Sequence, residues 1–190
     1  ARLVREHFEI VHGAGAEGDV IERHIADFGH VSRLLSVRLW PPSYLGDPPS
    51  DEIVVREDLE GVATVLVLEQ KSAVESVSTS DIAAWGKTRE GLFEIGLRNL
   101  LAGPAPALRK VVREEGLSFG VLTNDNSPAA TWVLGLSRFP ECIGRAGSLV
   151  AVPHRHAVVC QPVEEPPAAE AHTQLRAVID EMYVHGPGSI

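Results

Sequence analysis

Apolar and polar residues alternate along the chain with two different periods. Between residues 19 and 38 the apolar positions recur every three or four residues, which predicts a helix. Residues 8–11 alternate instead and predict a short strand. Residues 62–68 form an uninterrupted apolar run, which is typical of a strand that is buried on both faces.

Capping residues and prolines divide the rest of the chain. Thr79 or Ser80 is placed to cap a short helix that contains Trp85, and Thr88 to cap a second helix that ends at Gly103. We therefore expect two helices that meet at a corner. The other expected elements are a strand over 117–123, a helix from Ser127 and Pro128 to about 139, a hairpin of 149–152 and 156–162 around a turn at 153–155, and a helix over 168–185.

This order of elements predicts the fold class. Strands and helices do not alternate strictly, and no internal repeat is present, so we expect an α+β fold with a mixed or antiparallel sheet and helices packed on it. A length of 190 residues suits a single domain over 1–190. The prolines between 40 and 50 predict a loop there, because each one removes a backbone donor.

Composition narrows the possible partners. The net charge of −9 argues against a nucleic-acid partner, since affinity for phosphates rests on clustered Lys and Arg. No apolar run has the roughly 20 residues of a membrane span. Cys142 and Cys160 are too few for a disulfide framework, so we expect a reduced cytoplasmic protein in which Cys160 is a buried, inert thiol.

Several segments together resemble a known family. They are the strand at 62–70, the stretch 79–88 that leads into 94–100, the Asp125 turn before 129–131, and the segment 150–155. Over about residues 61–161 the chain resembles the YtpQ-like family, a bacterial domain family of unknown function. The resemblance implies a fold rather than a chemistry, because the shared motifs are structural in character. Lys87 and His156 differ from what that family tends to show at their positions.

A glycine-rich loop offers a candidate nucleotide site. Residues from Gly13 to Gly18 read G-x-G-x-x-G between an expected strand and an expected helix, the arrangement that admits a pyrophosphate. A dinucleotide site also needs a second strand that ends in an acidic residue about twenty positions on, and residues 35–41 do not supply one. A plain loop is therefore the favoured interpretation, and we expect no cofactor.

Two histidines suggest a metal site. His154 and His156 are two residues apart, so on an extended chain both face the same way, and Cys160 would share that face. Imidazole and thiolate are ligands for zinc or copper, but a site needs a third or fourth ligand that the spacing does not provide. The proline before Arg155 favours a turn with exposed histidines instead.

One loop is rich in hydrogen-bonding side chains. It consists of Asn124, Asp125, Asn126 and Ser127, between an expected strand and an expected helix. An Asx-type turn with an N-cap explains this composition, and an anion- or ligand-binding lip that includes Arg155 is the alternative.

The sequence yields three hypotheses for function. We expect a non-catalytic binding or interaction module whose partner is a protein or a small molecule, with no nucleic acid and no membrane. The alternatives are an enzyme or metal-dependent site formed by the 124–127 loop and the 153–156 turn, and a nucleotide-binding protein that uses Gly13 to Gly18. No catalytic residue is identified. Trp85, Asn99 and Arg155 are predicted to be architectural, holding two helices to a hairpin.

Overall fold

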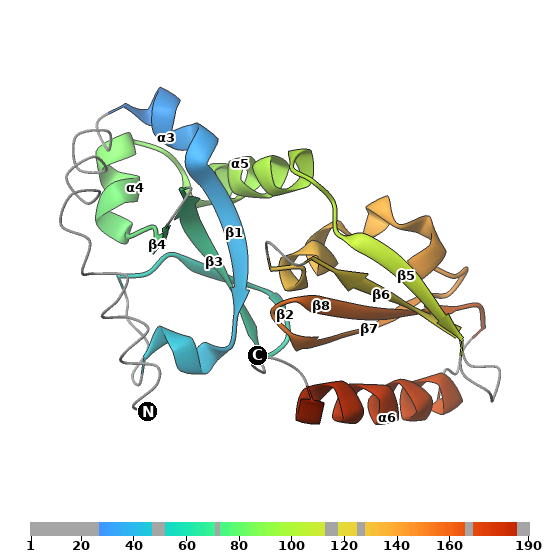
Figure 1. The fold of residues 1–190 in the computed structure, drawn as a ribbon. Coiled ribbons are helices and arrows are strands. Elements are labelled where there is room, and N and C mark those ends of the chain that lie inside the picture. The colour runs from blue at the N-terminus through green and yellow to red at the C-terminus, as the bar shows by residue number, and fades with distance from the viewer. Residues whose placement is uncertain are drawn as a thin grey trace.

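A computed structural model shows two four-stranded antiparallel sheets side by side, each with its own helices (Figure 1). It describes residues 27–46, 52–70, 73–112, 118–124, 128–165 and 169–185. The strand expected at 8–11 and the loop from Gly13 to Gly18 lie outside these residues.

The first sheet has β3 at its centre. Its strand order is β1-β3-β2, and β4 pairs with β3 as well. The strands are β1 (Leu35–Trp40), β2 (Val55–Leu59), β3 (Val62–Glu69) and β4 (Val74–Ser76). The helices of this unit are α3 (Phe28–Leu34), α4 (Thr79–Trp85), α5 (Arg89–Ala102) and the short 3-10 helix η1 (Pro42–Leu45).

The second sheet has the order β5-β6-β8-β7. Its strands are β5 (Ala107–Val112), β6 (Ser118–Thr123), β7 (Gly147–His154) and β8 (Ala157–Val163). Helix α6 (Ala169–His185) lies along this sheet (Figure 1), while the 3-10 helices η2 (Ala130–Arg138) and η3 (Pro140–Cys142) connect β6 to β7. The apolar residues of α6 and those of η2 and η3 pack in separate clusters on the sheet.

The α+β class is confirmed, and the structure divides the strands between two sheets where the sequence led us to expect one. Strands β2 and β5 were not predicted, and both carry consecutive charged residues, Arg56 to Asp58 in β2 and Arg109 with Lys110 in β5. No residue of either strand is fully buried, three being half-buried in β2 and two in β5, so their pattern lacks the apolar alternation that marks a strand.

The helix expected over 19–38 is wrong at its C-terminal end. Helix α3 stops at Leu34, and the next residues form β1, in which Leu35, Val37 and Leu39 are buried. These three residues pair with β3, and their side chains point to one face of the sheet. The adjacent Leu34 and Leu35 fit a helical stripe as well as a strand, and long-range pairing decides between the two.

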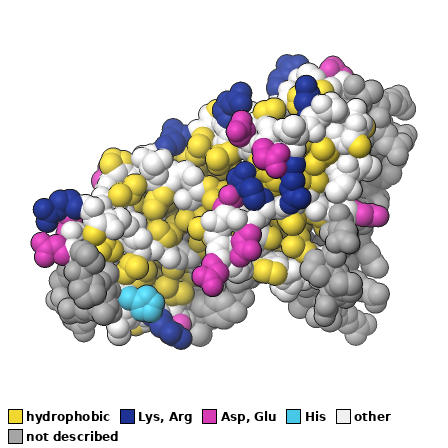
Figure 2. Space-filling model, turned by 180° about the vertical axis from the view of Figure 1, so that it is seen from behind, with side chains coloured by type: hydrophobic (Ala, Val, Ile, Leu, Met, Phe, Trp, Pro, Cys, Tyr) yellow, Lys and Arg dark blue, Asp and Glu magenta, His cyan; other side chains and the backbone are white. Residues whose placement is uncertain are grey.

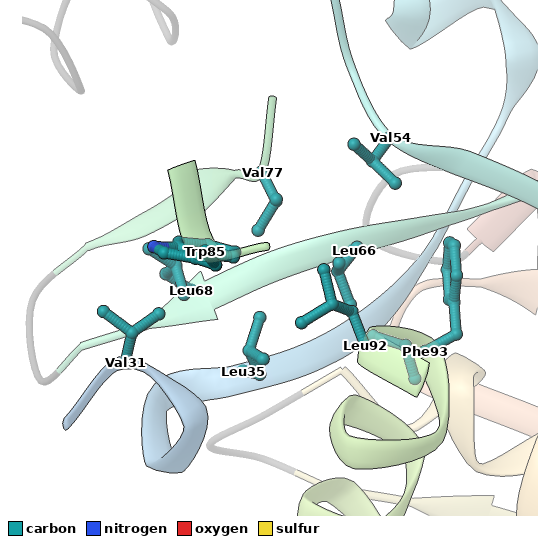
Figure 3. Packing of buried hydrophobic residues seen from close by; sticks show 10 residues of the cluster. Val31, Leu35, Val54, Leu66, Leu68, Val77, Trp85, Leu92 and Phe93 are labelled. Carbon is teal, nitrogen blue, oxygen red and sulfur yellow. The ribbon is translucent and has the colours of Figure 1, made fainter. Parts of the chain in front are cut away.

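The core of the first unit lies between β3 and the helices. Figure 3 shows Trp85 of α4 and Leu92 and Phe93 of α5 directed at Leu66 and its neighbours on the sheet. Trp85 is 7% exposed, and its ring centroid lies 5.9 Å from that of Phe28 in α3. The predicted architectural role of Trp85 therefore agrees with its position.

Polar side chains fix the ends of these helices. Ser78, not Thr79 or Ser80, caps α4, in a reciprocal pair with Asp81, while Thr88 caps α5 as expected. The side-chain amide of Asn99 donates to the carbonyl oxygens of Ser32 at 2.7 Å and Leu35 at 2.8 Å. Asn99 thus ties α5 to the junction between α3 and β1.

Helix η2 joins the two sheets. The Leu39 amide of β1 donates to the buried Thr131 hydroxyl at 3.3 Å. A Cβ at Gly135 would overlap the Leu101 side chain, so glycine allows η2 to lie close to α5. The helix expected from Ser127 is instead a 3-10 helix that begins at Ala130, with non-helical backbone angles at Gly135.

The two cysteines are joined, which corrects the expectation of a free thiol at Cys160. Cys142 in η3 and Cys160 in β8 form a disulfide, with their Cα atoms 5.5 Å apart, and both are buried. The argument from two unpaired cysteines to a reducing compartment therefore no longer holds. In the described part of the chain, no helix is both long and apolar enough to cross a bilayer.

Candidate functional site

The two segments singled out in the sequence meet at one end of the second sheet. Thr123, the last residue of β6, pairs with Ala157, the first residue of β8. Asn124 therefore follows β6 next to His156, which precedes β8, and His154 pairs with Ala157 from β7. Asp125, Asn126 and Ser127 lie outside the described residues.

His154 forms the buried side of this end. It is 8% exposed at the end of β7, and its Nδ1 accepts a hydrogen bond from the His156 amide at 3.2 Å. A ring nitrogen that accepts carries no proton, so neutral His154 is protonated on Nε2. Burial, and secondly the neighbouring His156, lower the pKa of His154 from its usual 6.5.

Arg155 forms the exposed side. Its Nε donates to Nε2 of His156 at 2.9 Å, which restrains the guanidinium. Its carbonyl oxygen accepts from the Ala130 amide at 3.1 Å and so anchors the turn to the start of η2. Among the described residues no carboxylate pairs with Arg155, and the residue is exposed.

The histidines are not arranged as a metal site within the described residues. Their ring centroids are 6.4 Å apart with planes inclined by 52°, and each ring already uses one nitrogen as an acceptor within the turn. Cys160, which the spacing placed on the same face, is in the disulfide. No group of three His, Cys, Asp or Glu side chains in this part of the chain could hold a metal. The predicted metal role of His154 and His156 stays a prediction.

The arrangement suits the binding of an anion. A guanidinium offers two parallel N–H donors to a carboxylate or a phosphate, and its Nε contact here restrains the group. Neither imidazole has a hydroxyl or thiol as a hydrogen-bond partner among the described residues, so the pairing of a nucleophile with a base is not seen there.

The sequence identified the residues of this site as candidates but did not predict that they lie next to one another in the fold. His154, Arg155, His156 and Asn124 were all candidates, yet nothing in the local pattern showed that Asn124 would follow a strand paired to the one after His156. The anchoring bond from Ala130 to the Arg155 carbonyl also depends on the path of η2. Strand register and the course of a connecting helix are tertiary properties that spacing does not carry.

The distribution of charge on the molecular surface also bears on the partner. Figure 2 shows acidic and basic side chains interspersed near the middle of the face drawn, while much of the remainder of that face is apolar or uncharged. The net charge of −9 is therefore not gathered into one acidic field on this face.

Comparisons with known proteins give no match: no family model, no curated protein and no solved structure is similar to this chain. The resemblance to the YtpQ-like family therefore stays a prediction.

Proposed function

We propose that the protein is a non-catalytic binding module that holds an anionic group of its partner, a carboxylate or a phosphate, at the end of the second sheet. The observation that carries this proposal is the exposed Arg155 guanidinium, which His156 restrains and which no carboxylate neutralises among the described residues. The partner is a protein or a small molecule.

Preorganisation supports the proposal. The turn is held by the pairing of β7 with β8, by the bond from the His156 amide to His154, and by the bond from Ala130 to the Arg155 carbonyl. Because the backbone and the Nε of Arg155 are already fixed, an incoming anion would order only a few remaining rotamers.

The test is calorimetric titration with acetate and with inorganic phosphate. We expect Arg155→Ala to weaken binding about tenfold or more, since a hydrogen bond to a charged group contributes roughly 1.5–3 kcal/mol. Arg155→Lys should recover only part of the affinity, because an ammonium group lacks the two-pronged geometry. Arg98→Ala, which removes an exposed arginine from α5, is the matched control.

The same titrations can reject the proposal. Absence of heat with every anion, or equal affinities for wild type and Arg155→Ala, would rule out an anion site at this turn. Uptake of Zn²⁺ that is lost in His154→Asn and His156→Asn would favour the alternative of a metal-dependent site at the same place.

A further inference from the structure

Strand β5 is an open edge of the second sheet. It pairs with β6 along its whole length, from Ala107 with Thr123 to Val112 with Ser118, and no described strand pairs with its other side. In Figure 1 it forms the outer margin of that sheet. An edge of this kind presents unpaired backbone N–H and C=O groups that can take up another strand.

The edge carries two cations. Arg109 and Lys110 are both exposed, and because they are consecutive in a strand, they point to opposite faces of the sheet. Lys110 shares its face with Leu108, which packs toward η2 and η3, and Arg109 shares its face with Val111, which packs toward α6. Neither cation forms an ion pair within the described residues.

The other strand edges differ from β5 in this respect. Arg56 on β2 pairs with Asp58 of the same strand at 2.8 Å. Arg38 on β1 pairs with Glu69 of β3 at 2.7 Å. Strand β7 carries no charged side chain before His154. Among these described edges, only β5 carries cations without an opposite charge.

We propose that the free edge of β5 binds an extended acidic segment of a partner protein, which adds a fifth strand to the second sheet. Acidic side chains on consecutive residues of such a strand would face Arg109 on one side of the sheet and Lys110 on the other. Val112, which is 65% exposed, and the half-buried Leu108 and Val111 supply apolar contacts at the neighbouring positions.

A second copy of this chain fits the edge less well. Antiparallel self-pairing centred on Arg109 or on Lys110 would set that cation directly opposite the same residue of the other copy. Like charges directly opposite each other on paired strands are destabilising. The two cations therefore favour an acidic partner over self-association, independently of the anion site at Arg155.

The test uses two labelled eight-residue peptides that each place two consecutive charged residues between valines, Glu-Glu in one and Lys-Lys in the other. Fluorescence anisotropy should show binding of the Glu peptide only. The double variant Arg109→Glu and Lys110→Glu should weaken this binding about tenfold and should gain binding of the Lys peptide, because both cross-strand charge pairs reverse sign.

The control is Arg89→Glu with Arg98→Glu, which changes the net charge by the same amount on the exposed side of α5. It should leave the affinity for the Glu peptide unchanged, and circular dichroism should confirm that both double variants are folded. Amide exchange should slow along β5 when the Glu peptide is bound.

Three results would overturn the inference. They are equal binding of the two peptides, equal loss of affinity in both double variants, and a concentration-dependent dimer, seen by sedimentation, in which the β5 amides are protected. Arg155→Ala separates the two proposals, because it should lower phosphate binding and leave the Glu peptide unaffected.

Discussion

The two sheets differ in whether the charged side chains on their strands and turns have partners among the described residues. In the first sheet Arg38 pairs with Glu69, Arg56 pairs with Asp58, and Glu57 accepts from the Gly61 amide. In the second sheet Arg109 and Lys110 on β5 have no carboxylate partner among the described residues, nor does Arg155 in the turn between β7 and β8.

This difference suggests a division of roles. A charged group that is satisfied within its own sheet contributes to the fold and offers little to a partner. A charged group that is exposed and unpaired contributes little to stability and is available for binding. We infer that the first unit is mainly scaffold and that the second unit carries the binding surfaces, and three variants test this division.

Trp85→Ala should have the largest effect. The side chain is buried against Phe28 in the core of the first unit, so its removal leaves a cavity that should cost about 3–5 kcal/mol of unfolding free energy. Trp85→Phe keeps a ring in place and should cost less. Chemical denaturation gives the energies, and phosphate titration at a temperature where the variant is folded should give wild-type affinity. Near-normal stability with lost binding would reverse the assigned roles.

Asn99→Ala should have an intermediate effect. Its amide satisfies the Ser32 and Leu35 carbonyl oxygens, and their loss as partners should cost about 1–3 kcal/mol. Glu94→Ala, at an exposed position of the same helix, is the control for a simple change of α5. Equal denaturation midpoints for the two variants would show that Asn99 does not hold α5 to α3.

His154→Asn should have the smallest effect, and it should depend on pH. Because the folded protein lowers the pKa of His154, the stability that depends on its neutral form is complete above pH 6.5 and is lost as the pH falls through the folded pKa. Asparagine keeps an acceptor oxygen near the position of Nδ1 and does not titrate. Denaturation at a series of pH values should therefore show a shallower acid decline in the variant.

Parallel pH profiles for wild type and His154→Asn would contradict this prediction. They would mean that burial of His154 has no energetic consequence for the turn.

The sequence predicted the fold best where both faces of a strand are buried or where capping residues mark the ends of a helix. Strand β3 was predicted because every residue from Ala63 to Leu68 is buried, and α5 because Thr88 and Gly103 mark its ends. Strand β1 was taken for helix because Leu34 and Leu35 suit both periods, and β5 was missed because its apolar residues are interrupted by Arg109 and Lys110.

The residues of the candidate site could be predicted from the sequence, but their positions relative to one another could not. His154, Arg155 and His156 stand together in the sequence, whereas the position of Asn124 beside them follows from the register of β6 and β8. The disulfide likewise needed the fold, because η3 brings Cys142 to β8 across a separation of 18 residues. Each of these pairings depends on a long-range register that local spacing does not encode.

The hydrogen bond from Leu39 to Thr131 sets an order of events during synthesis. All four strands of the first sheet are contiguous in the chain, so this sheet can form while the second is still being translated. Its Leu39 amide, however, receives its partner only when a residue 92 positions later has been made and η2 has docked. Until then the outer side of β1 remains in water and accessible to chaperones, and a chain that is truncated before η2 keeps that side open.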